Sequence, residues 1–539
     1  MLCNIKQSYS NIIQQLKIDL TLQKIISMQL KSRNTTSISD LNKFIGDSVE
    51  LQGWILNKRS SKGIVFLVLR DGSGYSQCII AQDKVGEDTL KEIDGLGLES
   101  SIYIKGIVVA DERQIGGVEV HADEVHIYHN TQDYPIAKKE HGVEFLMEKR
   151  HLWLRSKKQW AIMRVRNQII FSIHQFFQEK GFVQMDSPIF TGNAVEGTST
   201  LFETEFFDKP AYLSQSGQLY GEAMAMSLGK IYTFGPTFRA EKSKTRRHLS
   251  EFWMIEPEMA FHDNDMNMDL IEEFIQYIVK SILKSCKFEL EELGRDTTML
   301  EKVAQKFPRI SYDNAVLYLT GKENVNGRNA IQLLQADLEN AGNRIEEIDA
   351  DIVSRENAIK AGGMKKGVIA FNEKKILELK AEGKELEELK RNIPQWISSA
   401  QNFEYGSDFG GSDETVLTRL FDTPIMVYNW PKAIKAFYMK EAEDNATLVK
   451  GVDVLAPEGY GKIVGGGERE TDLNILIDAI NTHELPMSAF EWYLDLRRFG
   501  SVPHAGFGLG LERMVSWVCK IQHVRESIPF PRMMGTLFP

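Results

Sequence analysis

Residues 233–261 read TFGPTFRAEKSKTRRHLSEFWMIEPEMAF and predict the β-hairpin around which the rest of the chain is organised. One strand is expected over residues 231–239 and a second over 252–261, with a polar loop at 240–248 between them. Successive side chains of a strand point to opposite faces of the sheet. One face of the second strand is therefore expected to carry Phe252, Met254, Glu256 and Glu258.

The loop of this hairpin holds more positive charge than a connection needs. It contains Lys242, Lys244, Arg246, Arg247 and His248. The whole chain has a net charge of -11, so the concentration is local. It indicates a site at which an anion docks. For a hairpin standing alone, the simpler interpretation would be a solvated basic loop on an antiparallel sheet.

Residues 501–531, SVPHAGFGLGLERMVSWVCKIQHVRESIPFP, supply a second unusual element. Glycines alternate along an apolar strand at 506, 508 and 510, and apolar residues then recur at helical spacing. Glycine weakens a strand interior unless another group must approach the backbone closely. Arg513 opens the predicted helix, where the N-terminal amides already favour an anion.

Together these elements resemble the signature motifs of the class II aminoacyl-tRNA synthetases. FRAE and RHL followed by an EFW strand resemble motif 2, and GFGLGLER resembles motif 3. An amphipathic helix at 158–180, ended by Gly181, and a strand to Pro188 resemble motif 1, the family's dimer element. Alone, that helix would be an ordinary core helix. The resemblance implies an α+β fold with an antiparallel catalytic β-sheet and a homodimer formed through the motif 1 helix.

The length of 539 residues allows several domains. Hydrophobic residues make up 42% of the chain and charged residues 26%, which is typical of a folded protein. The acidic balance argues against indiscriminate nucleic-acid binding, so an RNA partner must be met by local basic patches. The cysteines are scattered, without the paired spacing of a zinc site or a disulfide framework. No secretion signal or membrane-spanning run is evident, and a cytoplasmic protein is expected.

Residues 39–131 are expected to form an all-β barrel of the OB type. Five short β-rich runs lie within this range: VELQGWIL, IVFLVLRD, YSQCIIA, SIYIKGIVVA and VEVHADEVHIY. Residues 1–38 are polar, have no evident ordered role and are interpreted as an N-terminal extension. A linker at 132–157 leads to the catalytic domain, which is expected over 158–539.

A coiled-coil pattern interrupts the catalytic domain at about residues 327–400. Apolar residues follow four-three spacing over 334–352 and again over 376–393, with glycines at 362 and 363 between the two runs. The pattern predicts an antiparallel helical hairpin inserted into the domain. The sequence assigns no chemistry to it.

In the aspartate, asparagine and lysine subgroup of the family, an OB domain precedes the catalytic domain and reads the anticodon. The resemblance places the stacking aromatic of that domain at Phe66 and its glutamine at Gln77. They would read the middle uridine of the anticodon by stacking and by hydrogen bonding to the base edge. Taken alone, Phe66 is as readily explained as a core residue.

The resemblance also implies ATP-dependent activation of an amino acid, in which a carboxylate attacks the α-phosphate and gives an adenylate and pyrophosphate. Such a site aligns its substrates and offsets negative charge without a covalent nucleophile. Arg239 matches the catalytic arginine that bridges the α-phosphate and the substrate carboxylate, and Arg513 the one that holds the γ-phosphate. The other positions that match ATP contacts are Glu241, Arg247, His248 and the adenine-stacking Phe252.

The expected amino acid is asparagine. Aspartate enzymes have a lysine at the position of Gly221, whereas here Glu222 follows that glycine, as in asparagine enzymes. An asparagine side chain offers a carbonyl, which needs a donor, and an NH2, which needs an acceptor. Arg498 is expected to meet the carbonyl, and Glu222 the amide, directly or through water. The substrate ammonium is assigned to Glu256, and the pocket is completed by Glu196, Ser216 and Gln218.

The cofactors implied are ATP and Mg²⁺, but the metal-binding stretch departs from the family pattern. A glutamate is usual where GKIVGGGERE has Lys462, and a glutamine where it has Glu468. A lysine cannot coordinate Mg²⁺. Either Glu468 or a neighbouring acid such as Glu458 binds the ion, or Lys462 replaces part of its charge, or activity is reduced. Glu468 is the predicted ligand.

The function that follows is ATP-dependent ligation of asparagine to its cognate tRNA through an asparaginyl-adenylate. An aspartate–tRNA ligase of relaxed specificity is disfavoured by Gly221 and Glu222, and a tRNA-independent asparagine synthetase by the presence of the OB domain. A non-catalytic tRNA-binding paralogue is favoured by Lys462 but opposed by the arginines of motifs 2 and 3. Lysine specificity is opposed by Arg498.

Overall fold

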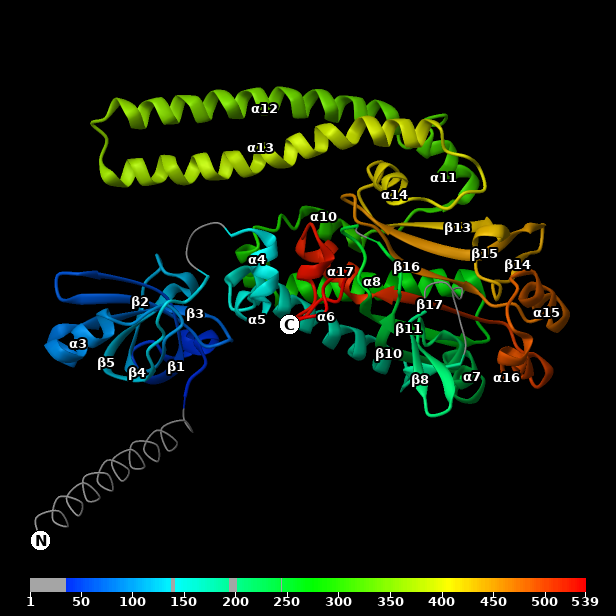
Figure 1. Cartoon of the computed structure of the whole chain (residues 1–539), viewed down its shortest axis with the longest axis horizontal. Coiled ribbons are helices and arrows are strands. Elements are labelled where there is room, and N and C mark those ends of the chain that lie inside the picture. Colours follow the sequence, from blue (N-terminus) through cyan, green and yellow to red (C-terminus); the bar gives the residue numbers. More distant parts are fainter. Residues whose placement is uncertain (1–34, 137–140, 193–200, 244) are drawn as a thin grey trace, which may run out of the picture. The chain divides into compact units, whose positions relative to one another are not determined.

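The computed structural model describes residues 35–136, 141–192, 201–243 and 245–539 (Figure 1). The chain divides into two compact units, Met1–Phe145 and Leu146–Pro539, and each is described by itself. Most of the predicted N-terminal extension lies outside the described residues, as do Glu196 and Lys244.

The first unit contains the predicted barrel, closed in the order β1-β2-β3-β5-β4. Its strands are β1 (Ser48–Ser61), β2 (Ile64–Arg70), β3 (Tyr75–Ala81), β4 (Ser101–Ala110) and β5 (Val118–His129). The short helices beside them are η2 (Ile38–Phe44), α2 (Gln82–Val85) and α3 (Glu87–Asp94). Alternate residues of β2, including Val65, Leu67 and Leu69, fill the barrel interior, so Phe66 lies on the outer face.

The second unit is built on a nine-stranded sheet with the order β12-β13-β15-β16-β17-β11-β10-β6, and β14 pairs with β15 beside this path. All neighbours are antiparallel except β12 with β13 and β10 with β6. The strands are β6 (Val183–Met185), β10 (Lys230–Phe238), β11 (Glu251–Ala260), β12 (Arg309–Ser311), β13 (Ile425–Pro431), β14 (Glu441–Ala442), β15 (Asn445–Ala456), β16 (Gly461–Glu468) and β17 (His504–Gly510). A separate small sheet consists of β7 (Phe190–Thr191), β8 (Glu203–Phe206) and β9 (Lys209–Leu213). The predicted fold class, including the antiparallel catalytic sheet, is confirmed.

The predicted hairpin is β10 and β11, and the glycine-rich strand β17 lies next to it. A Cβ added at Gly506 would lie 2.3 Å from the Glu258 carboxyl carbon, and one at Gly508 would lie 2.6 Å from Met254 Cε. The alternating glycines thus make room for side chains of β11, as the sequence predicted.

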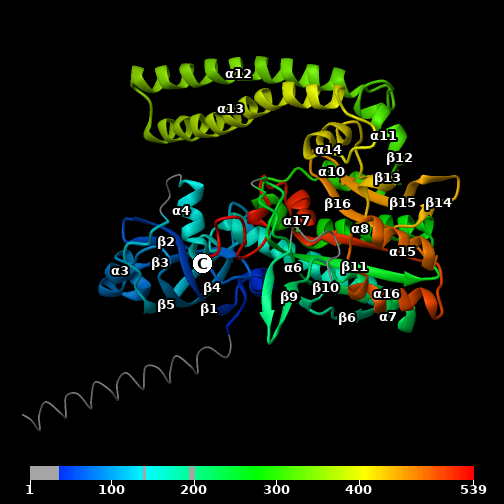
Figure 2. The ribbon, with the colours of Figure 1, turned by 45° about the vertical axis from the view of Figure 1, so that its right-hand side comes forward.

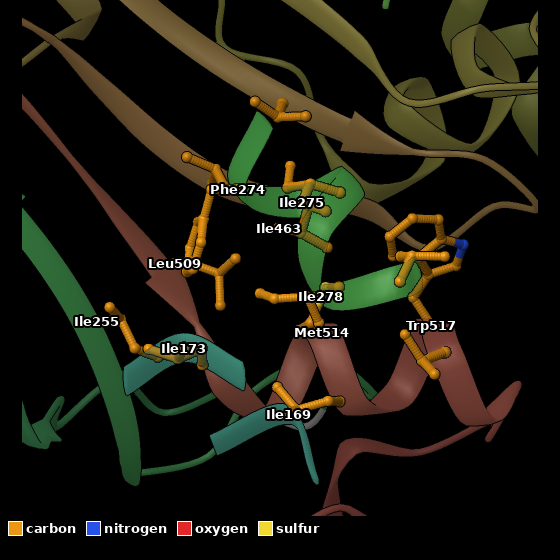
Figure 3. Packing of buried hydrophobic residues seen from close by; sticks show 14 of the residues in the cluster. Ile169, Ile173, Ile255, Phe274, Ile275, Ile278, Ile463, Leu509, Met514 and Trp517 are labelled. Carbon is orange, nitrogen blue, oxygen red and sulfur yellow. The ribbon is translucent and has the colours of Figure 1, made fainter. Parts of the chain in front are cut away.

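Helices α6 (Lys157–Glu179), α8 (Asn264–Ser285) and α17 (Leu511–Cys519) cover one face of this sheet. Figure 3 shows Ile173 of α6 and Ile278 of α8 packed near Ile255 of β11 and Met514 of α17. Because Ile255 points into this core, Phe252, Met254 and Glu256 point to the opposite face. The remaining helices of the unit are α4 (Val143–Glu148, which begins in the first unit), α5 (Arg150–Trp153), α7 (Gln218–Leu228), α9 (Lys287–Glu292), α10 (Thr298–Glu301), α11 (Tyr312–Leu319), α14 (Gly411–Thr418), α15 (Leu473–Thr482) and α16 (Met487–Arg498).

The predicted insertion is a pair of long antiparallel helices, α12 (Ala330–Ala361) and α13 (Lys366–Gln401), which run side by side in Figures 1 and 2. Gly362 and Gly363, at φ 76 and 79, form the turn, because both adopt the left-handed backbone that glycine tolerates. Near its root the hairpin contacts the rest of the unit through Glu388, which pairs with Arg246 of the β10–β11 loop. No helix in the described part of the chain is both long and apolar enough to cross a bilayer.

Candidate active site

A cavity of about 620 Å³ lies on the face of the sheet opposite the helical core. Strands β11, β16 and β17, the β10–β11 loop and the segment 433–439 form its walls. This volume is within the range of small-molecule sites, ~300–1,000 Å³. All six residues that the sequence assigned to ATP line it: Arg239, Glu241, Arg247, His248, Phe252 and Arg513.

Phe252 and Arg239 lie against each other on one wall. The guanidinium carbon of Arg239 is 5.4 Å from the centre of the Phe252 ring. The two residues are diagonal neighbours at the loop end of the hairpin, where Arg239 follows β10 and β11 begins just after the basic loop. An aromatic face and a cation are thereby presented together, a combination suited to a base and a phosphate.

Five residues, Arg247, Arg513, Lys435, Asp453 and Lys462, form what we call the cationic end of the cavity. Arg513 Nη1 donates to the carbonyl oxygen of Lys462 at 2.9 Å. Arg247 Nη1 donates to Glu414 Oε2 at 2.9 Å, and the same oxygen accepts from the Lys462 amide at 3.1 Å. The backbone of Lys462 is therefore held between the two arginines that the sequence assigned to phosphate.

Gly461 makes this arrangement possible. Its φ is 69, and a Cβ there would lie 2.1 Å from Glu414 Oε2 and 2.7 Å from Arg247 Nη1. Any other residue would be strained and would displace the Glu414 carboxylate. The glycine thus fixes where β16 begins and where Lys462 enters the cavity.

Both oxygens of Asp453 are occupied by ammonium groups. Lys462 Nζ lies 2.9 Å from Oδ1, and Lys435 Nζ lies 2.8 Å from Oδ2. Burial opposes the ionised form of Asp453, but the two lysines outweigh it and lower the pKa of this carboxyl. Burial likewise opposes the charge of Lys462, but Asp453 raises its pKa. This part of the wall is therefore charged and locked by ion pairs.

The structure pairs Glu468, the predicted metal ligand, with two lysines. Its carboxylate is buried, does not line the cavity, and lies 2.7 Å from Lys440 Nζ and 3.4 Å from Lys450 Nζ. The alternative acid, Glu458, accepts from both terminal nitrogens of Arg295, at 2.9 and 2.6 Å. Within the residues that the structure describes, no group of three or more acidic, histidine or cysteine side chains is placed to hold a metal ion. These donors do not fit a protein-bound Mg²⁺, because each acid is already neutralised by cationic side chains.

The other end of the cavity, which we call the amino-acid end, is lined by Ser216, Gln218, Glu256 and Arg469. Glu256 accepts hydrogen bonds from the Ser216 hydroxyl and from the Gly217 amide, the latter at 2.7 Å. These bonds fix a carboxylate at the cavity wall. The arrangement suits a substrate ammonium.

Glu222 lies one layer behind this wall and does not line the cavity. Its side chain is fully buried, and Oε2 contacts the Tyr493 hydroxyl at 2.7 Å, Arg497 Nη2 at 3.0 Å and His504 Nε2 at 3.0 Å. Burial opposes its charge, but Arg497 and His504 hold the pKa of Glu222 well below its usual range. Its Oε1 accepts from Gln218 Nε2 at 3.1 Å. The sequence predicts that Glu222 meets the substrate amide directly or through water; in the structure its bond toward the cavity is the one to Gln218, which lines the wall.

Arg498, which the sequence predicts to meet the substrate carbonyl, does not line the cavity. It lies on the outer side of α16, where it donates to Glu491 at 3.0 Å and Asp495 at 2.9 Å. At the amino-acid end, the arginine that lines the cavity is Arg469, which was not predicted from the sequence. Arg469 Nη2 donates to Glu258 Oε1 at 2.5 Å, and its Nε lies 4.0 Å from Glu222 Oε1.

Glu258 and Arg469 form a buried pair next to Glu222. Burial and the nearby Glu222 carboxylate raise the pKa of Glu258 to about 7, although Arg469 acts against this shift. The glycines at 465–467 do not identify Arg469, because a Cβ added at Gly465 would meet Lys462, and those at 466 and 467 would meet backbone of the neighbouring strands. No signal in the sequence points to this arginine.

In the barrel, Phe66 and Gln77 lie on neighbouring strands and on the same outer face. The register pairs Phe66 with Ile79 and Val68 with Gln77, which makes the two residues diagonal neighbours. The Arg59 guanidinium lies 4.6 Å from the centre of the Phe66 ring. Gln77 Nε2 donates to Glu119 Oε2 at 2.8 Å. An aromatic face, a cation and an amide are therefore available together on this surface.

The comparisons with known proteins match both units. Residues 142–534 match the family model described as tRNA synthetases class II (D, K and N), and residues 49–128 match the OB-fold nucleic acid binding domain. An asparagine–tRNA ligase of Sorangium cellulosum is 45% identical over 511 residues, which cover 95% of this chain and 100% of that protein. One of Symbiobacterium thermophilum is 44% identical over 504 residues, 93% and 99% of the two chains.

Among solved structures, this chain is similar to the asparaginyl-tRNA synthetase of Pyrococcus horikoshii complexed with asparaginyl-adenylate. The TM-score is 0.76 at 37% identity, and the match covers 94% of this chain and 100% of the other. The likeness therefore extends over both units and includes the region around the cavity.

Proposed function

This chain belongs to the class II tRNA synthetases for aspartate, lysine and asparagine, and we propose that within this family it ligates asparagine to tRNA. The observation that carries the proposal is that one cavity joins a cationic wall to a wall with a fixed carboxylate and a buried arginine. The first wall suits a triphosphate, and the second suits an uncharged amino acid. Activation of that amino acid by ATP gives asparaginyl-adenylate and pyrophosphate.

The chain's own residues align the two substrates. Phe252 stacks on adenine, Arg239 bridges the α-phosphate and the attacking carboxylate, and Arg513 holds the γ-phosphate. Glu241, Arg247 and His248 complete the ATP site. No side chain has to form a covalent bond, because negative charge that develops at the α-phosphate is offset by arginines already in place. The adenylate then passes its asparaginyl group to the terminal ribose of tRNA.

Asparagine is bound at the amino-acid end. Glu256 accepts from the substrate ammonium, Arg469 donates to the side-chain carbonyl, and Gln218 meets the amide with its orientation fixed by Glu222. A second carboxylate, as in aspartate, would lie near Glu256 and in front of the ionised Glu222. A site with mismatched buried polar groups discriminates by about 10⁴ or more, which is sufficient for this choice. The relatives named above support asparagine over the aspartate and lysine alternatives.

Mg²⁺ accompanies the ATP substrate in this proposal and is not assigned to any carboxylate of the chain. The acids at the predicted position are neutralised by lysines and Arg295. The steps above therefore depend on the arginines and on the alignment of the substrates.

The barrel binds the anticodon, with Phe66 stacking on the middle base and Gln77 bonding its edge. Loss of one stacked base costs ~1–3 kcal/mol. Phe66→Ala should therefore raise the KM for tRNA about 10-fold while asparagine-dependent ATP–pyrophosphate exchange is unchanged. An equal loss in both assays would contradict an anticodon role.

A homodimer forms through α6 and the edge strand β6. Phe171 on α6 is 59% exposed, and Val183 is 42% exposed on β6, an edge strand that is paired with β10 on one side only. Phe171→Asp should shift the mass measured by light scattering from two chains to one. We place the protein in the cytoplasm, where its buried thiols Cys78, Cys286 and Cys519 remain reduced.

The test of the proposed function is ATP–pyrophosphate exchange measured with asparagine, aspartate and lysine, followed by charging of tRNA. Exchange with asparagine alone, together with charging, is expected. Equal exchange with aspartate would favour the relaxed aspartate enzyme. ATP binding without exchange for any amino acid would favour the non-catalytic paralogue.

A further inference from the structure

Lys462 stands where the family pattern has an acid, and it occupies the centre of the cationic end. Its carbonyl accepts from Arg513, and its amide shares the Glu414 oxygen with Arg247. Its side chain is 33% exposed and lines the cavity. The contacts that orient Arg247 and Arg513 therefore also fix the position of Lys462.

The fold also makes room for the lysine chain. A Cβ added at Gly465 would lie 2.9 Å from Lys462 Cε and 3.2 Å from its Nζ. The ammonium is anchored by Asp453 at 2.9 Å, and Asp453 is balanced by Lys435 on its other oxygen. Lys435 Nζ also lies 3.8 Å from Asp408, and Glu414 pairs with Arg247. Two lysines and two arginines thus face three carboxylates, which leaves a net positive charge at this end.

From these contacts, and on the basis of the proposed function, we propose that the Lys462 ammonium binds the β- and γ-phosphates of ATP in place of a protein-bound divalent cation. A lysine is a compact charge with several donors, and it serves as a phosphate ligand elsewhere. Asp453 holds this charge in position and does not act as a metal ligand. The enzyme then needs no metal ion beyond the one that travels with ATP.

The experiment is calorimetric titration of ATP into the full chain in EDTA and in excess Mg²⁺. Wild type is expected to bind ATP in EDTA. Lys462→Met should weaken that binding about 10- to 100-fold, which corresponds to one charge-assisted hydrogen bond to phosphate. Lys462→Arg should retain it. Lys450→Met is the matched control, because Lys450 pairs with Glu443 and Glu468 outside the cavity and its loss should leave ATP binding unchanged.

Lys462→Glu provides the opposite test, because it restores a second carboxylate next to Asp453. This variant should bind ATP poorly in EDTA and recover when Mg²⁺ is added. At fixed MgATP, its exchange rate should rise with free Mg²⁺, whereas the wild-type rate should stay flat. Thermal melting of each variant checks that the fold is retained.

Equal ATP binding by wild type and Lys462→Met in EDTA would overturn the inference, as would a wild-type exchange rate that rises with free Mg²⁺ as steeply as that of Lys462→Glu. ATP binding needs neither asparagine nor tRNA, so the two proposals fail separately. Lys462-dependent binding in EDTA without exchange for any amino acid would reject the proposed function and keep the role of Lys462.

Discussion

The two ends of the cavity both contain many charges, but they hold them differently. At the amino-acid end, Glu222 and Arg497 have fully buried side chains and bond each other behind the wall. At the cationic end, Arg247 and Lys462 keep 27% and 33% of their side chains exposed toward the cavity. The charges behind the amino-acid end bond one another in a closed network. Those of the cationic end face the cavity, where a ligand can reach them.

In the proposed function, this difference assigns the selection of the amino acid to one end of the cavity and the attraction of ATP to the other. Buried, paired charges cannot adjust, so they fix the hydrogen-bonding pattern of Gln218 and Arg469 that a substrate must match. Partly exposed charges remain accessible from the cavity, so they can bind a highly charged triphosphate. The amino acid is therefore selected at the end where the structure is rigid.

The largest expected effect is on stability and contrasts two adjacent arginines. Arg497→Met leaves Glu222 buried without its strongest partner, and the loss of one member of a buried pair costs ~3–5 kcal/mol. Arg498→Met removes a surface arginine whose partners lie on its own helix. Urea unfolding should show a clear fall in midpoint for the first and none for the second. Equal midpoints for both would mean that the Glu222 network does not support the fold.

The next effect is on specificity, through Glu222→Gln. The substitution keeps the size of the side chain but removes the charge that Arg497 and His504 face. Hydrogen bonds to a charged group contribute ~1.5–3 kcal/mol, so kcat/KM for asparagine in pyrophosphate exchange should fall about 10- to 100-fold. The Kd for ATP should stay unchanged. A parallel loss of ATP binding would show that the two ends are not independent.

Periodic features of the molecule could be predicted from its sequence. The β10–β11 hairpin, the glycines of β17, the five barrel strands and the α12–α13 insertion each repeat a pattern that only one type of element satisfies. The ATP residues could be located because they are close in sequence to these elements. Their meeting in one cavity follows from the sheet order that joins β11, β17 and β16.

The roles of other residues could not be predicted in this way. They depend on which side of a helix the residue faces, or on whether it lies behind the cavity wall. Arg497 and Arg498 are adjacent in sequence, but a helix turns by ~100° per residue, so one enters the network and the other faces outward. Nothing in the sequence distinguishes them. The surroundings of Glu468 could not be predicted for a similar reason, because its lysine partners, Lys440 and Lys450, come from a neighbouring segment and strand.

A smaller effect is expected from salt. Screening shortens the range of electrostatic attraction from ~10 Å at 0.1 M to ~3 Å at 1 M ionic strength and acts mainly on exposed charges. Raising the salt concentration should therefore weaken ATP binding several-fold and leave asparagine binding nearly unchanged. Calorimetric titration of each ligand in a series of NaCl concentrations gives both dependences. Equal slopes for the two ligands would remove the contrast between the two ends.

The smallest effect is a proton taken up by His248, which lines the cavity close to the cationic end. Burial and the nearby Arg513, Arg239 and Arg247 lower the pKa of His248 from its ordinary value of 6.5, while Glu241 acts against this shift. The imidazole is thus neutral at neutral pH in the free enzyme, and the negative charge of bound ATP must raise its pKa again.

ATP binding should therefore take up more protons near pH 6.5, the ordinary pKa of a histidine, than at about pH 8. Titrations in buffers of different ionisation enthalpy measure this uptake, and His248→Asn should abolish it. Asparagine has no net charge, so its binding should show no uptake at either pH. If asparagine binding took up as much proton as ATP, or if His248→Asn kept the ATP-linked uptake, the titrating group would lie in the closed network, and the two ends would be coupled.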